Sequence, residues 1–165
     1  MSAKEKYSKI KEFFWRLGPV QNKKGLAIGL LYMDYTSRFG GGDKKLEEYV
    51  RTQAHNYSFK PFSDITEAEC KSFFKTVSLD KEEYPEIVLD LLSTGDQYDG
   101  ISNPSLVELV ARILEIKSSD IVFDLGSGYG NFLVAVGYFN RDQAIRPALY
   151  GQEINIDAYN VSCMA

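Results

Sequence analysis

A glycine-rich turn that follows a short apolar run is the part of the sequence best suited to ligand chemistry. Residues 121–125 are β-branched and aromatic and predict a buried parallel strand, with Asp124 near its end. Glycines follow at alternate positions, where they let the backbone turn tightly and approach a ligand without a Cβ clash. The apolar segment 132–139 then predicts a helix, whose first N–H groups would point at the ligand. A strand, a glycine-rich turn and a helix form the first half of a nucleotide-binding βαβ unit; the glycines are Gly126, Gly128 and Gly130.

The spacing of these glycines and the acidic residues around them indicate what kind of ligand would fit. The pattern Gly-x-Gly-x-Gly is shorter than the dinucleotide pattern Gly-x-Gly-x-x-Gly and leaves less room for a pyrophosphate. Asp124, two residues before the first glycine, suits a ligand with a cationic amino group. A second short strand is expected at 148–150, and Glu153 follows it where an acidic residue would take ribose hydroxyls.

Three segments resemble, in order, the motifs of a known enzyme family. The run Phe-Asp-Leu-Gly-Ser-Gly-Tyr-Gly at 123–130 is similar to the first motif of class I S-adenosylmethionine-dependent methyltransferases. Residues 150–155, with the pair Tyr159-Asn160 and Met164 after them, resemble adenine-N6 DNA methylases, in particular the modification subunits of type I restriction systems. Residues 100–110 are similar to the motif that precedes the first strand in that family.

The resemblance implies a fold, a cofactor and its contacts. The implied fold is α/β, with a helical N-terminal region over 1–94 and part of a Rossmann-like methyltransferase domain over 95–165, ending after the second strand. The implied cofactor is S-adenosyl-L-methionine, with Glu153 on the ribose hydroxyls and Ile154 packed on adenine. Asn103 replaces a Thr that helps hold the methionine end in the family. The expected cofactor contacts are Asp124, Gly126, Ser127, Gly128, Gly130, Glu153, Ile154 and Asn103.

The catalytic motif of the family does not occur in this sequence. Adenine-N6 methylases hold the target amino group and stack the flipped base with an Asn/Asp-Pro-Pro-aromatic tetrapeptide, which is missing from the 165 residues. We therefore expect no catalytic residue and no activity of the chain alone, with DNA reached through a larger assembly that holds specificity or restriction subunits. Three explanations stay open: a part of a larger methylase, a remnant that acts through partners, or a homo-oligomer in which another copy completes the sheet.

The glycine motif also leaves alternatives open. Asp-Leu-Gly-Ser-Gly is common in methyltransferases of other substrate classes, so a different methyl acceptor is one of them. Tyr129 stands where the family has glycine, and its ring would either stack on the cofactor or narrow the site. The plainest alternative is that the turn connects a strand to a helix and binds nothing.

Composition and charge set limits on the partners. The chain is 44% hydrophobic and 25% charged, which is typical of a globular protein with a sizeable core. Its net charge of −4 argues against a strong nucleic-acid surface on this chain alone. Cys70, Cys163 and the single His55 have no metal-ligand spacing, so no metal is expected. No secretory signal is visible and residues 26–33 are too short to span a membrane, so we expect a cytoplasmic protein without a membrane partner.

Helices are expected to position the site and to form the N-terminal region. In the first helix, apolar residues that include Tyr7, Phe13 and Phe14 recur at three- and four-residue spacing and predict one stripe. Such a stripe usually packs inside its own domain. It also motivates a second hypothesis, a non-catalytic interaction module that docks to other subunits of a modification complex. The expected N-terminal helices are 2–17, 23–39, 43–55, 66–77 and 81–92, and a helix over 104–116 would bury Leu106, Val107, Val110, Ile113 and Leu114.

Overall fold

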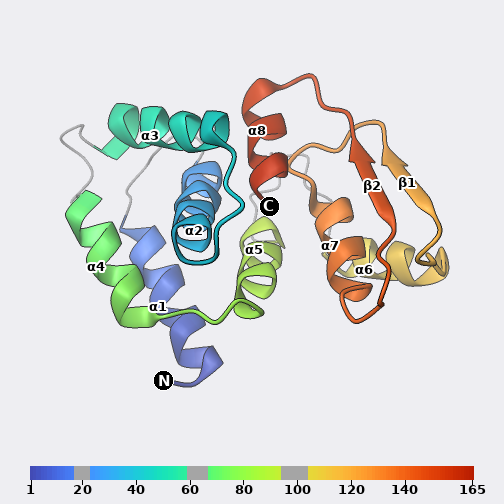
Figure 1. The fold of residues 1–165 in the computed structure, drawn as a ribbon, viewed down its shortest axis with the longest axis horizontal. Coiled ribbons are helices and arrows are strands. Elements are labelled where there is room, and N and C mark those ends of the chain that lie inside the picture. The colour runs from blue at the N-terminus through green and yellow to red at the C-terminus, as the bar shows by residue number, and fades with distance from the viewer. Residues whose placement is uncertain (17–22, 59–66, 94–103) are drawn as a thin grey trace. The chain divides into compact units, whose positions relative to one another are not determined.

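The computed structural model describes residues 1–16, 23–58, 67–93 and 104–165 (Figure 1). These residues are mostly helical and include a small parallel sheet of two strands, which agrees with the expected α/β character. It divides into two compact units, one of residues 1–87 with Met164 and the other of residues 88–163 with Ala165. The expected boundary at 94/95 and the expected cofactor contact Asn103 lie outside the described residues.

Polar side chains cap the starts of the first and third helices in the first unit. At the start of the first helix, the Ser2 hydroxyl accepts from the Glu5 N–H and the Glu5 carboxylate accepts from the Ser2 N–H, a capping box. At the third, Asp43 Oδ1 accepts from the N–H of Lys45 at 2.7 Å. The helices are α1 (Ala3–Trp15), α2 (Lys23–Phe39), α3 (Lys44–Ser58), α4 (Glu67–Val77) and the first part of α5 (Glu83–Ser93), close to the segments expected from the sequence.

Most of the apolar stripe of α1 is buried, as the more conservative interpretation of the sequence predicts, and Tyr7 is half-buried. Ile10, Phe13 and Phe14 are each at most 5% exposed. The Phe13 ring stacks on the Phe73 ring of α4, with ring centroids 4.0 Å apart and an interplanar angle of 6°. Trp15, at the end of the helix, is instead 77% exposed. The stripe therefore holds α1 to α4 and does not form an exposed surface.

A close helix crossing joins α2 to α3. A Cβ built on Gly29 would lie 2.8 Å from Cγ2 of the buried Val50, so the two helices approach as closely as they do because residue 29 has no side chain. Glycine in a helix interior costs about 1 kcal/mol relative to alanine. The buried Val50 side chain occupies the space that a Cβ at residue 29 would need.

Polar contacts fix the start of α5 within the first unit. Lys6 Nζ of α1 donates to Glu83 Oε2 at 2.7 Å. The Tyr84 hydroxyl donates to the Asp34 carboxylate of α2 and accepts from the Arg38 guanidinium at 3.0 Å. Burial of Tyr84, together with the adjacent Asp34 charge, raises the pKa of the phenol well above its usual value of 10.

The second unit contains the sheet and the helices that follow from it. Strands β1 (Ile121–Asp124) and β2 (Ala148–Gly151) are parallel, with Ile121 opposite Ala148 and Asp124 opposite Gly151. α7 (Asn131–Phe139) connects them and packs against both strands, and α6 (Pro104–Ile113) packs on α7 (Figure 1). α8 (Ile156–Met164) follows β2.

The prediction that the first strand is buried is wrong for one face of the sheet. Ile121, Phe123 and Leu125 are 74%, 55% and 77% exposed. Successive side chains of a strand point to opposite faces, and α7 packs on only one of them. No described part of the second unit covers the other face, which also carries the half-exposed Tyr150 of β2.

The predicted buried face of the helix before β1 is also largely wrong. Val107 is buried and Val110 is half-buried, but Leu106, Ile113 and Leu114 are each more than half exposed. The helix is strongly amphipathic. Within the described part of the second unit, α7 is the element against which it packs extensively. An amphipathic pattern predicts which side is apolar and does not say whether anything covers it.

Candidate functional site at the glycine turn

Two glycines of the turn have backbone angles that favour glycine. Gly128 and Gly130 have φ angles of +51° and +85°, in the left-handed region. Gly130 is also the N-cap of α7, and a Cβ there would lie 3.0 Å from Cβ of Ser162 in α8. A Cβ on Gly126 or Gly128 would meet no other atom within 4 Å. The turn therefore packs tightly at its end and faces open space at its beginning.

The backbone N–H groups of the turn donate to acceptors inside the unit. Two of these acceptors are carboxylates, one from the end of β1 and one from the segment after β2. The bonds run from Gly126 to Asp124 Oδ1 at 3.2 Å, from Ser127 to the Gln152 carbonyl at 3.0 Å, from Gly128 to Glu153 Oε2 at 2.8 Å, and from Gly130 to the Ser127 carbonyl at 2.7 Å. The turn is thus held to both strands.

Glu153 uses both of its oxygens in this arrangement. Oε2 accepts from the Gly128 N–H, and Oε1 accepts from the Asn155 N–H at 2.7 Å. These bonds, the one from Asn155 first, outweigh the effect of burial and hold the pKa of the Glu153 carboxyl below its usual value of 4.5. Asn155 in turn caps α8, because its Oδ1 accepts from the N–H of Asp157 at 2.9 Å.

Ser127 packs against the second strand. The residue is only 8% exposed, and its hydroxyl donates to the Gln152 carbonyl at 3.4 Å. A Cβ on Gly151 of β2 would come within 2.8 Å of the Ser127 hydroxyl oxygen and 2.9 Å of Leu133. The absence of a side chain at Gly151 therefore lets Ser127 and α7 approach the strand.

The expected site residues of the described chain meet at the carboxyl ends of the two strands. Asp124 ends β1 opposite Gly151, and Glu153 is bonded to the turn, so the structure brings the two carboxylates to the same edge of the sheet. Ile154 follows and is fully exposed. In a parallel sheet this edge, beside the start of a connecting helix, is where ligands bind.

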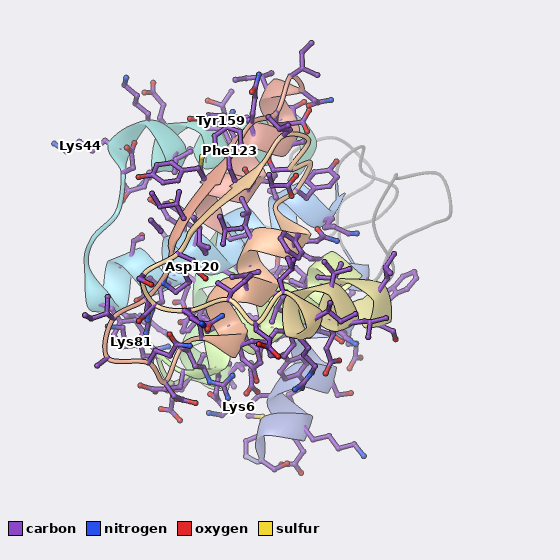
Figure 2. All side chains as sticks on the ribbon, turned by 90° about the vertical axis from the view of Figure 1, so that its right-hand side faces the viewer. Lys6, Lys44, Lys81, Asp120, Phe123 and Tyr159 are labelled. Carbon is purple, nitrogen blue, oxygen red and sulfur yellow. The ribbon has the colours of Figure 1, made fainter. Side chains whose placement is uncertain are left out.

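Charge is distributed unevenly along the strands of the second unit. The lysines and arginines of residues 104–165 all precede β1 or lie between α7 and β2; they are Arg112, Lys117, Arg141 and Arg146. Asp120, at the other end of β1, accepts from the Lys117 N–H at 2.8 Å. In Figure 2, Asp120 and Phe123 mark the two ends of this strand. The edge with Asp124 and Glu153 is therefore an acidic one.

Sequence reasoning missed several residues that build the site. Gly151, Gln152 and Asn155 shape the segment after β2, and the Asn131 amide at the start of α7 donates to the Leu92 carbonyl at 3.2 Å. The spacing Asn155-x-Asp157 ahead of a helix is a recognisable N-cap signal. The role of Gly151 depends on how close Ser127 comes, which no local pattern reveals.

Neither a metal cluster nor a membrane-spanning helix is found in the described part of the chain. Among the described residues, no group of three or more His, Cys, Asp and Glu side chains is arranged to hold a metal ion. In the same part of the chain, no helix has the length and apolar character needed to cross a membrane.

Comparison with protein-family models, curated proteins and solved structures finds no match to the chain.

Proposed function

We propose that this chain is the N-terminal and cofactor-binding part of an S-adenosylmethionine-dependent methyltransferase, of the adenine-N6 DNA methylase type found in restriction-modification systems. The observation that carries the proposal is the meeting of Asp124, the glycine turn and Glu153 at the carboxyl edge of a β–α–β unit. The resemblance of 123–130 and 150–155 to the motifs of that family supports the same assignment.

The charges at this edge support a ligand that bears positive charge. S-adenosylmethionine carries an ammonium group and a sulfonium centre, and Asp124 would attract the ammonium group at close range. The open space in front of Gly126 and Gly128 would admit the methionine and the ribose. Glu153 keeps lone pairs for ribose hydroxyls, because each carboxylate oxygen can accept more than one hydrogen bond. Ile154, exposed beside it, would pack on the adenine ring.

The target-base half of the site would come from elsewhere in a larger assembly. The sequence lacks the Asn/Asp-Pro-Pro-aromatic tetrapeptide, so the chain alone would not transfer a methyl group. The exposed apolar face with Ile121 and Phe123 suits cover by further elements of such a methylase. DNA would be engaged with the help of specificity or restriction subunits, in the cytoplasm where the DNA lies.

The alternative of a non-catalytic interaction module has less support. It depended on the aromatic stripe of α1, and Phe13 and Phe14 of that stripe are buried. The exposed aromatic side chain of this helix is Trp15. A docking surface needs a contiguous apolar patch rather than one exposed ring.

Calorimetric titration of the whole chain with S-adenosylhomocysteine and S-adenosylmethionine tests the proposal. Asp124→Asn keeps an oxygen for the Gly126 N–H and removes the charge, and we expect it to weaken binding at least about tenfold, the usual size of one hydrogen bond to a charged group. Asp120→Asn is the matched control, because it makes the same change at the other end of β1. The proposal fails if the folded chain binds neither ligand, or if the two variants bind equally well.

A further inference from the structure

The N–H groups of the glycine turn are already bonded within the chain, and this bears on which ligands the turn accepts. A phosphate-binding glycine turn leaves its N–H groups free to surround the anion. Here the N–H groups of Gly126 and Gly128 donate to the carboxylates of Asp124 and Glu153. A phosphate at this place would have to displace two carboxylates and their negative charge.

The start of α7 strengthens this argument. Gly130 offers no side-chain cap to α7, so the helix N-terminus favours a negative charge in front of it. The chain supplies that charge itself, because Glu153 is bonded to Gly128, two residues before the N-cap. The Glu153 carboxylate thus occupies the kind of position that a phosphate takes in an anion-binding turn.

We infer that Glu153 is a specificity-determining residue that excludes phosphate-bearing nucleotides from the turn. It does so because its carboxylate bridges the N–H groups of Gly128 and Asn155. The site is then left to nucleosides whose 5′ substituent is neutral or cationic. We call this set of hydrogen bonds between Glu153, Gly128 and Asn155 the Glu153 bridge. The inference rests on the proposed function in so far as the ligand contains adenosine. Exclusion of anions by the bridge is a separate property of the chain.

The ligand arm of the experiment compares adenosine with adenosine 5′-diphosphate by calorimetry. The two ligands share the nucleoside, so any contact between Glu153 and the ribose cancels in the ratio of their dissociation constants. The wild-type chain is expected to prefer adenosine, and Glu153→Gln is expected to reduce this preference at least about tenfold, because it removes the charge and frees one N–H. Glu115→Gln, the same change in the exposed turn before β1, should leave the ratio unchanged.

A second arm detects the Glu153 bridge without any ligand. In the ¹⁵N-labelled chain, the amide resonances of Gly128 and Asn155 should titrate together, with a midpoint below 4.5, the usual pKa of a glutamate. Asp124 at the end of β1 and Asp157 in the first turn of α8 are neighbouring carboxylates along the chain. The Glu153→Gln variant isolates the contribution of Glu153, since the shared step should disappear in it.

The outcomes separate this inference from the proposed function. The inference is overturned if a folded Glu153→Gln variant keeps the wild-type ratio of the dissociation constants of adenosine and adenosine 5′-diphosphate. It is also overturned if the Gly128 amide resonance depends on pH in the same way in wild type and in Glu153→Gln. If the wild-type chain binds neither adenosine nor S-adenosylhomocysteine, the proposed function fails. Titration with inorganic pyrophosphate then decides the inference: binding to Glu153→Gln but not to wild type supports it, and equal behaviour refutes it.

Discussion

Individual residues of the glycine turn have different tasks, although the sequence presents them as one repeated pattern. Gly130 is required by its φ angle and by the approach of Ser162, whereas Gly126 has an ordinary φ and open space around it. The alternate spacing predicts the turn that the structure shows, and the acidic residues on either side predict a ligand site there, which stays a prediction. The burial of Ser127 against Gly151 was not predictable, because it depends on which strand lies beside the turn.

Alanine substitutions separate these tasks. Gly130→Ala should destabilise the second unit by about 1–3 kcal/mol, because it forces a Cβ into the left-handed region and against Ser162. Gly126→Ala should change stability by less than about 1 kcal/mol. Denaturant unfolding followed by circular dichroism measures both. An equal loss of unfolding free energy in the two variants would contradict the different surroundings of Gly126 and Gly130.

At the scale of elements, the helix pattern predicted the segments well and their surroundings poorly. The bounds of α2 agree with the expected helix, and the burial of Phe13 and Phe14 follows from their spacing. The pattern of α6 predicts a buried apolar face in the same way, yet Leu106 and Ile113 are exposed. The difference lies in the partners available to each helix, since the periodicity is similar in both and only packing decides which apolar side is covered.

The crossing of α2 and α3 gives a prediction whose sign opposes helix propensity. Gly29→Ala improves propensity but places a Cβ 2.8 Å from Val50, so we expect a net loss of about 1–3 kcal/mol of stability. In a Val50→Ala background the same change should be neutral or stabilising by up to about 1 kcal/mol. A double-mutant cycle from urea unfolding measures the coupling. Additive effects would argue against a close crossing at this glycine.

The contact between α2 and α5 predicts a dependence of stability on alkaline pH. The pKa of Tyr84 is raised in the folded chain, so its contribution is complete below pH 10, where the unfolded phenol is protonated. Above pH 10 the unfolded tyrosine ionises first, and stability should fall as the pH rises. Tyr84→Phe should be less stable at pH 8 and show a flatter decline between pH 9 and 11. Parallel wild-type and variant curves would contradict the Tyr84–Asp34 contact.

For the whole molecule, the sequence indicated a helical region followed by an α/β region, and the structure has both. Composition could not indicate the exposed apolar face of the sheet, because a strand that alternates between a covered and an open face can carry apolar residues on both. Ile121 and Leu125 show this directly. The net charge of −4 and the acidic edge of the sheet also bear on partners at this scale.

The overall charge predicts weak binding to DNA by the chain alone. Non-specific binding depends on lysine and arginine contacts to phosphates, and the edge with Asp124 and Glu153 has none in residues 120–131 or 148–165. Fluorescence anisotropy with a labelled duplex at about 200 mM salt should give a dissociation constant weaker than about 10⁻⁴ M. Micromolar binding that weakens steeply with salt would contradict this expectation and would show that the chain has a basic DNA-binding surface.

We propose that an adenosyl cofactor binds at the carboxyl edge of the two strands. The most direct test is an NMR titration of the ¹⁵N-labelled whole chain with S-adenosylhomocysteine. We expect saturable shifts of the amides of residues 124–130 and 151–155, with the amides around Lys117 and Arg146, at the other end of the strands, unchanged. A folded chain that shows no shifts, or shifts confined to other residues, would contradict the claim.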